Sequence, residues 1–330
     1  VLVRWAEVMK SIEPELGRYL VPSLDLDMRP KSGKLVFTVA FRGDEFRSRK
    51  ATVESAFKRE WGKPDSPFVE PKQQATAPEI PFRDIADKGI VLTGFGKKAF
   101  VSGADVRFLA KIDSVKMGEE TSRGSQVCVD AIQAVQKPTI AALNGLAFGG
   151  GIEIAMACEA RIATKGLRVL AGQPEANLGI IPGAGGTFRL PRIVGIENAN
   201  VMLRGCRPIS SEKALAFGLI REEVASGLVG RAVALCRDMV DGKAERSRMS
   251  EAPLENVPET LPAVEIGHLS TKVDEILQKA ILGAARLPLA EAIPFEAKCF
   301  GEVCGTEDMR IGVDNFMKNG PKSKAEFVHR

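Results

Sequence analysis

Histidine is nearly missing from this sequence of 330 residues, and cysteine never occurs in a metal-binding pattern. The only two histidines, His268 and His329, lie late in the chain, which argues against Ser–His–Asp or Cys–His catalysis. The six cysteines contain no CxxC pair, so a structural zinc site is not expected. A disulfide framework is equally implausible in so long and hydrophobic a chain, and we expect a reducing, cytoplasmic location.

A strong excess of one charge is also missing. Lys and Arg number 46 and Asp and Glu number 42, and the resulting net charge of +4 is spread along the whole chain. A nucleic-acid site would instead show a clustered basic stripe, so we expect no nucleic-acid partner. No apolar run is long enough to cross a bilayer, and no membrane partner is expected. Hydrophobic residues make up 45% of the sequence and charged residues 27%, as in a soluble globular protein.

The length exceeds that of a usual single domain, so we expect one large domain with a smaller appendage. Residues 1–33 form a predicted N-terminal arm, and 34–243 form the core. Within the core, 62–81 carry five prolines and are predicted to be an irregular insertion. Residues 244–330 begin with a Pro-rich linker and continue as a helical C-terminal region. The chain begins with Val1, which suggests processing or an origin in a longer protein.

Short strands alternate with helices in the core, which predicts an α/β architecture. The tail is predicted to be mostly helical, with a face formed by Leu269, Val273, Ile276, Leu277, Ala280 and Ile281. The expected order in the core is strand 34–41, helix 51–61, strand 89–93, loop 94–103, a helical stretch to about 135, strand 139–143, a Gly-rich turn, a short apolar helix from 151 and a further strand-like segment before 175.

Glu153 is the single charge in the thirteen-residue apolar stretch Leu146–Cys158, so its surroundings should be dry. Glu159 is the next acid, and on a continuous helix it would lie about 120° around from Glu153. The glycines at 149–151 precede this helix and leave unpaired amides at its positive end, which suit an anion or a developing oxyanion. The alternative is that these glycines only let a strand and a helix pack closely.

Glu175 follows a proline in Gly172–Glu175 and precedes the glycine-rich segment 182–186. A surface ion pair is the ordinary alternative for any single glutamate. The segment Gly94–Ala99 imitates a dinucleotide-binding fingerprint. Because Gly103 interrupts the required helix and no acidic second strand follows, it is a weak match.

The sequence contains, in this order, the segments Ile90–Val106, Lys137–Cys158 and Gly172–Arg192, and together they resemble the signature of the crotonase (enoyl-CoA hydratase/isomerase) superfamily. Gly205–Ile220 is similar to the family's next segment, and Gly312–Phe327 resembles its tail more loosely. The resemblance implies a ClpP-like spiral of ββα repeats and a helical C-terminal region used for oligomerisation. It also implies assembly as a homotrimer or a dimer of trimers.

The resemblance further implies that the backbone amides of Ala104 and Gly150 bind the oxygen of a thioester. Glu153 and Glu175 fill the positions of the family's two catalytic glutamates, and Gly183 resembles a further backbone site that positions water. Addition of water to an α,β-unsaturated thioester needs a base for water, an acid for the α-carbon and donors for the enolate oxygen. We assign Glu153 as the base for water and Glu175 as the proton donor to Cα.

The leading hypothesis is therefore an enoyl-CoA hydratase that converts a 2-enoyl-CoA into a 3-hydroxyacyl-CoA. The substrate is an acyl-CoA thioester, and no separate cofactor or metal is expected. The enzymatic alternatives are an enoyl-CoA isomerase, a dehydratase or the hydratase part of a bifunctional fatty-acid oxidation protein. An RNA-binding crotonase-like protein is the alternative from another class, and the presence of both acids weighs against it.

Overall fold

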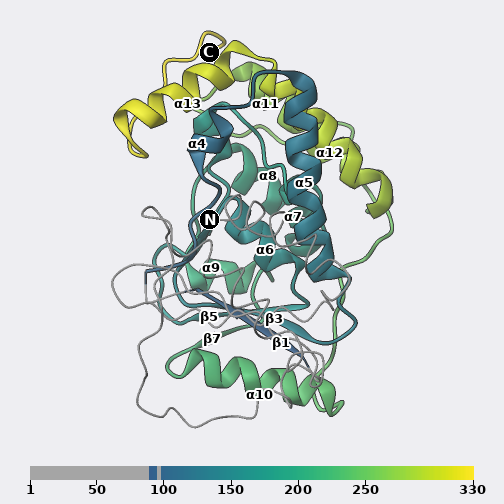
Figure 1. The fold of residues 1–330 in the computed structure, drawn as a ribbon. Helices are drawn as coiled ribbons and strands as arrows, with labels where there is room; N and C mark the ends of the chain where they lie inside the picture. Colours follow the sequence, from purple (N-terminus) through teal and green to yellow (C-terminus); the bar gives the residue numbers. More distant parts are fainter. Residues whose placement is uncertain (1–88, 95–97) are drawn as a thin grey trace, which may run out of the picture.

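The computed structural model describes residues 89–94 and 98–330. The predicted arm 1–33, strand 34–41, helix 51–61 and insertion 62–81 lie outside the described residues. In the described part, strands and helices alternate up to about residue 240, and helices alone follow (Figure 1).

Two parallel sheets form the centre of the described chain. The larger sheet has the strand order β1-β3-β5-β7, and the smaller has the order β2-β4-β6. All pairings between neighbouring strands are parallel. The strands are β1 (Ile90–Thr93), β2 (Ala99–Val101), β3 (Thr139–Leu143), β4 (Leu146–Phe148), β5 (Ala160–Thr164), β6 (Ala171–Gly172) and β7 (Glu222–Val224).

Helices surround these sheets, and serine or threonine caps the N-termini of α5, α9, α11 and α13 by accepting a hydrogen bond from a first-turn amide. The helices are α4 (Val106–Leu109), α5 (Val115–Gln133), α6 (Gly150–Ala157), the 3₁₀ helix η1 (Glu175–Leu178), α7 (Gly186–Val194), α8 (Ile196–Arg204), α9 (Ser211–Ala216), α10 (Leu228–Val240), α11 (Thr271–Ala285), α12 (Leu289–Cys304) and α13 (Glu307–Asn319).

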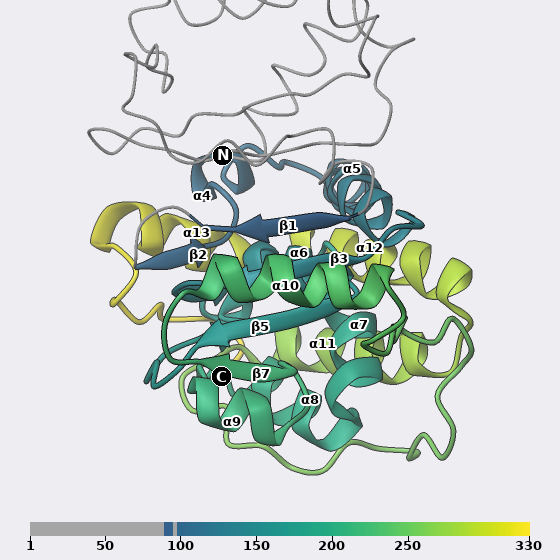
Figure 2. The same ribbon diagram turned by 90° about the horizontal axis from the view of Figure 1, so that it is seen from below.

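Strand β3 is buried on both faces, and its alternate side chains enter two different cores. Ile140 and Ala142 pack with Leu235 and Met239 of α10, which lies across one face of the larger sheet (Figure 2). Ala141 and Leu143 point to the opposite face and join the main core. This two-sided burial accounts for the wholly apolar character of β3 after Thr139.

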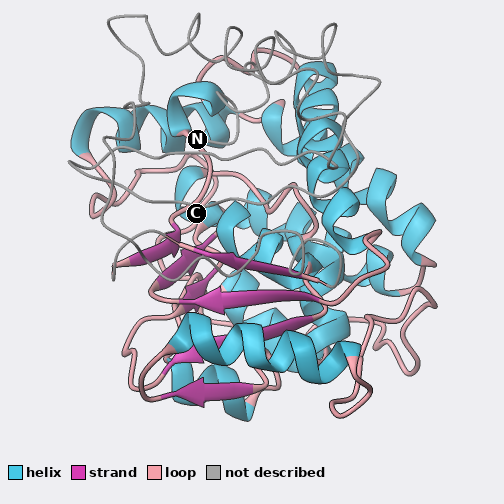
Figure 3. Cartoon of the chain, turned by 60° about the horizontal axis from the view of Figure 1, so that its bottom comes forward, coloured by secondary structure: helices cyan, strands magenta, loops and turns pink. Residues whose placement is uncertain are grey.

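Successive strands alternate between the two sheets: β1, β3 and β5 enter the larger sheet, and β2, β4 and β6 enter the smaller. A helix follows each of the first two strand pairs, β1–β2 and β3–β4, so the predicted spiral of ββα repeats is confirmed (Figure 3). The prediction of a plain loop over 94–103 was wrong, because β2 lies within it. The predicted Gly-rich turn after β3 likewise contains β4. Strands of two or three residues are too short to show a periodic pattern.

The helical C-terminal region is confirmed. Helix α11 carries the predicted apolar face, except that Leu269 is buried just before the helix begins. Between Asp241 and Ser270, all of which is described, no helix or strand occurs, in agreement with a linker. Helix α12 then runs along α5 (Figure 1). The domain boundaries themselves stay predictions.

Glycines on both helices permit this close approach. A Cβ added at Gly118 of α5 would lie 2.7 Å from the Cβ of Cys304, and one added at Gly301 of α12 would lie 2.6 Å from the carbonyl oxygen of Val115. Both distances are too short for carbon or oxygen neighbours. The α5–α12 contact therefore requires glycine on each helix.

We expect Gly118→Ala to lower the free energy of unfolding by roughly 1–2 kcal/mol, because the clash outweighs the higher helix propensity of alanine. Gly124→Ala is the matched control, since Gly124 lies on the same helix, is exposed and has no atom within 4 Å of an added Cβ. The control should raise the unfolding free energy by roughly 0.5–1 kcal/mol. Urea denaturation measures both, and a stabilised Gly118→Ala would contradict the tight contact.

Candidate active site

Glu153 lies in the first turn of α6 and is only 2% exposed. Its Oε1 accepts hydrogen bonds from the amides of Ala184 (2.8 Å) and Gly186 (2.7 Å) in the glycine-rich loop that precedes α7. The loop therefore holds one carboxylate oxygen, and Oε2 is the oxygen that faces the start of α6. The sequence-based expectation of a dry environment is confirmed.

Gly150 lies near both this second oxygen and the amide of Ala104. A Cβ added at Gly150, the first residue of α6, would lie 3.9 Å from the amide nitrogen of Ala104 and 3.9 Å from Oε2 of Glu153. Gly149 has φ +52°, and this left-handed conformation turns the chain from β4 into α6. Ala104 lies in the turn between β2 and α4.

Glu175 begins η1 and is 9% exposed. Its Oε1 would lie 2.5 Å from a Cβ added at Gly149, whose Cβ would also lie 3.9 Å from Cα of Gly103. The turn at Gly149–Gly150 therefore connects Glu175 with Ala104 and Glu153. Oriented to donate, the side-chain amide of Gln173 lies 3.1 Å from both carboxylate oxygens of Glu175.

Both carboxyl groups hold protons more tightly than exposed glutamates. Burial raises the pKa of Glu153 to about 8, and the charge of Glu296 adds to the rise. The amides of Ala184 and Gly186, together with Arg189, act in the opposite direction. Burial also raises the pKa of Glu175 well above 4.5, and the charge of Glu153 contributes next. The two acids consequently titrate as a pair.

Gly183 lies in the same loop as the amides that bind Glu153. Its carbonyl oxygen accepts a hydrogen bond of 2.6 Å from the hydroxyl of Ser122, and an added Cβ would lie 2.7 Å from the ring of Phe300. Glycine is therefore required here for packing. The water-positioning role of Gly183 stays a prediction.

Glu159 was misplaced by the sequence analysis. Helix α6 ends at Ala157, so the angle calculated for a continuous helix does not apply. The carboxylate of Glu159 forms an ion pair of 2.7 Å with Arg246, away from Glu153. Residues 95–97 of the segment Gly94–Ala99 lie outside the described residues, and Ala99 begins strand β2.

Glu296 was not predicted as a site residue; it is fully buried in α12 and accepts hydrogen bonds from the same glycine-rich loop. Its position in the sequence could have indicated its burial. Glu296 lies four residues after Ala292 and four before Phe300, both buried, so it occupies the apolar stripe of its helix. An acid in such a position requires compensating donors.

The sequence model of the enoyl-CoA hydratase/isomerase family matches residues 82–264, and the chain belongs to this family. A short-chain-enoyl-CoA hydratase of Clostridium acetobutylicum is 34% identical over 230 residues, which cover 69% of this chain and 77% of that protein. A crotonyl-CoA hydratase of Syntrophomonas wolfei is 33% identical over 248 residues, which cover 75% and 83%. The family predicted from the sequence is confirmed.

A solved structure of an enoyl-CoA hydratase/isomerase from Mycobacterium paratuberculosis has a TM-score of 0.51 at 18% identity, and the match covers 69% of this chain and 80% of that chain. At this identity the likeness concerns the fold, which is the predicted crotonase fold. A fatty acid oxidation complex subunit alpha of Idiomarina loihiensis is 30% identical over 202 residues, 61% of this chain and 28% of that longer protein. Among the residues described, no helix is both long and apolar enough to cross a membrane.

Glu153→Gln should make the protein more stable at alkaline pH. The pKa of Glu153 is about 8 in the folded protein, above the ordinary value of 4.5. Between these two pH values the folded protein binds a proton that the unfolded protein has released. The stability of the wild type therefore falls as the pH rises through this range. Glutamine cannot ionise and keeps an oxygen for the two amides. We expect equal stability near pH 5 and an advantage on the order of 3 kcal/mol near pH 9.

Thermal or urea unfolding across this pH range measures the difference. Glu302→Gln is the control, because Glu302 lies on the surface of α12 and pairs with Lys279. Its effect should be nearly constant with pH. Parallel pH profiles for wild type and Glu153→Gln would show that Glu153 ionises normally.

Proposed function

We propose that this protein is an enoyl-CoA hydratase, which adds water to a 2-enoyl-CoA thioester and forms a 3-hydroxyacyl-CoA. The observation that carries the proposal is the convergence of two buried carboxyl groups, Glu153 and Glu175, on a glycine turn beside the amides of Ala104 and Gly150. The hydratase names of relatives that align over most of this chain support it.

The amides of Ala104 and Gly150 would bind the thioester oxygen and stabilise the negative charge that it acquires in the enolate. The amide of Gly150 lies at the N-terminus of α6, where backbone N–H groups have no partner within the helix and the helix dipole is positive. Each donor in such a dry site contributes about 3–4 kcal/mol to lowering the barrier.

The two glutamates would supply the proton transfers. Because burial raises the pKa of both groups, the pair retains a proton in the neutral range. Glu153 accepts a proton from water as its oxygen bonds to the β-carbon, and Glu175 gives its proton to the α-carbon. The number of protons on the pair is unchanged after one turnover, and only their positions are exchanged.

This reaction is neutral in redox terms and needs only acid, base and oxyanion stabilisation, so the proposal includes no separate cofactor. The CoA moiety is part of the substrate. A cytoplasmic location and assembly as a homotrimer or a dimer of trimers stay predictions.

Glu153→Gln and Glu175→Gln should each lower kcat on crotonyl-CoA by about 10²- to 10⁴-fold, because each removes one proton-transfer group. The affinity for the CoA ester should change little, since the amides of Ala104 and Gly150 remain. Absorbance at the wavelength of the enoyl thioester measures kcat, and calorimetry with a non-reacting CoA ester measures binding.

Glu159→Gln is the matched control, because Glu159 is also shielded from solvent but pairs with Arg246. Its kcat should remain within about three-fold of wild type. Full activity in either Glu153→Gln or Glu175→Gln would refute the two-acid scheme.

Incubation with 2-enoyl-CoA and 3-enoyl-CoA esters in separate reactions should distinguish hydration from isomerisation. We expect a 3-hydroxyacyl-CoA from the 2-enoyl ester, because two acids can activate water, and we expect no NAD reduction when the product accumulates. Mass spectrometry detects the added water as a gain of about 18 Da. Conversion of the 3-enoyl ester to its 2-enoyl isomer with no gain of mass in either reaction would favour the isomerase.

A further inference from the structure

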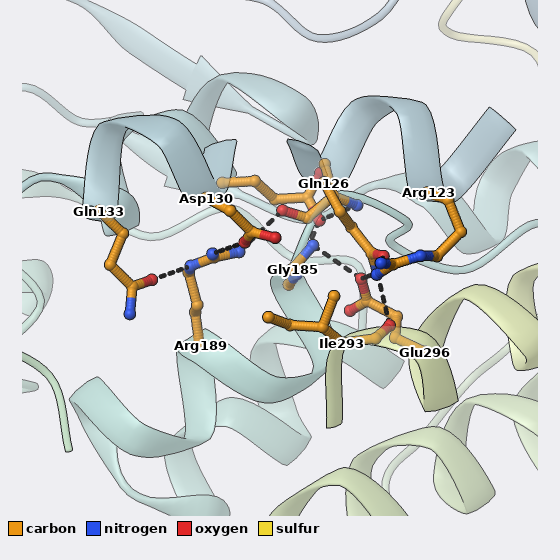
Figure 4. A network of polar contacts seen from close by, with 11 residues as sticks. Arg123, Gln126, Asp130, Gln133, Gly185, Arg189, Ile293 and Glu296 are labelled. Carbon is orange, nitrogen blue, oxygen red and sulfur yellow. Dashed lines mark hydrogen bonds and ion pairs between the residues drawn. The ribbon is translucent and has the colours of Figure 1, made fainter. Parts of the chain in front are cut away.

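Four consecutive amides, two in the loop before α7 and two in its first turn, donate to two buried carboxylates in alternation. The amides of Ala184 and Gly186 donate to Glu153, and those of Gly185 (2.7 Å, Figure 4) and Thr187 (2.8 Å) donate to Glu296. Glu153 comes from α6 and Glu296 from α12, so residues 184–187 are held by two helices that are far apart in the sequence.

Each carboxylate oxygen of Glu296 accepts two hydrogen bonds. Its Oε1 accepts from the amide of Gly185 and from Nε2 of Gln126 (3.1 Å). Its Oε2 accepts from the amide of Thr187 and from the Thr187 hydroxyl (2.6 Å). Three of these four groups are N–H donors that cannot accept an O–H, so the arrangement favours the anion and opposes the rise that burial causes in the pKa of Glu296. Four charge-assisted hydrogen bonds offset the cost of burying it.

The charged groups around Glu296 and Glu153 come from several elements. The positive charge of Arg189 of α7 acts on both carboxylates, and Arg189 is itself bound by Asp130 (2.6 Å) and Gln133 (2.9 Å) of α5 (Figure 4). Glu175 of η1 is the third buried acid and lies close enough to sense both. The charge of Glu296 raises the pKa of Glu153, and Arg189 and the amides of Ala184 and Gly186 offset part of this rise.

We infer that Glu296 is a positioning residue of this active site: it fixes the loop that holds Oε1 of Glu153 and places a negative charge near that acid. This inference rests on the proposed hydratase function. Glu296 makes its contacts through the loop rather than with substrate. Loss of its hydrogen bonds to Gly185 and Thr187 frees the neighbouring amides of Ala184 and Gly186, which orient Glu153.

Glu296→Gln preserves shape and removes the charge, and Glu296→Asp preserves the charge and shortens the reach. Glu296→Gln should lower kcat by about 10- to 100-fold and leave KM within about three-fold. It should also move both limbs of the pH profile to lower pH by about one unit, because a neighbouring negative charge no longer opposes ionisation of Glu153. Glu296→Asp should lower kcat with the limbs unmoved.

Glu302→Gln is again the control, since it removes a carboxylate from the exposed side of the same helix. Should Glu296→Gln not fold, Thr187→Val tests the same contact, because valine has the shape of threonine without the hydroxyl that donates to Glu296. Thr187→Val should lower kcat several-fold, and Thr187→Ser, which restores a hydroxyl, should recover most of the loss.

A readout independent of turnover keeps this inference separate from the proposed function. In protein labelled with ¹³C at the glutamate carboxyl carbon, with Glu153→Gln assigning the signal, Glu153 should titrate about one pH unit lower in Glu296→Gln. Wild-type protein inactive on every enoyl-CoA ester would defeat the proposed function. The role of Glu296 would be overturned if Glu296→Gln kept the wild-type kcat and pH profile. It would also be overturned if Glu153 titrated at the same pH in Glu296→Gln as in the wild type.

Discussion

The binding of buried carboxylates by backbone amides is the interaction on which this structure depends. Three glutamates lie within one water-poor region, and each ionised carboxylate would cost several kcal/mol there without donors. The loop at residues 184–187 supplies four amides, and glycines at 183, 185 and 186 let its backbone approach helices and side chains closely. Helices α5, α6 and α12 each hydrogen-bond residues 183–187, through Ser122, Glu153 and Glu296.

The same region shows a conflict between stability and chemistry. Burial raises the pKa of Glu153, Glu175 and Glu296, and the charge of neighbouring glutamates adds to the rise for Glu153 and Glu175, so ionisation is opposed. For a structural protein such a cluster would only be a cost. For an enzyme that must hold a proton in the neutral range and then pass it to carbon, the raised pKa values are useful. The large apolar core around β3 and α11 supplies stability that tolerates this cost.

Much of the fold could be predicted from the sequence, because β3 and α11 are long enough to show continuous burial or apolar periodicity. The short strands β2, β4 and β6 could not, since each is held by pairing with its neighbours rather than by its own pattern. Glu153 was recognisable as a lone charge in an apolar stretch. Glu296 was overlooked because its significance depends on a loop more than one hundred residues earlier, and no local pattern connects the two.

The place of α12 in the chain has a consequence for biosynthesis. The ribosome completes both sheets, the glycine turn and the loop before α7 well before it makes α12, which begins at Leu289. Until that helix emerges and docks on α5, the amides of Gly185 and Thr187 have water as their partner instead of a carboxylate. A nascent chain can therefore have most of its α/β core in place while its reaction centre is still unfinished, so maturation is delayed until α12 has been translated.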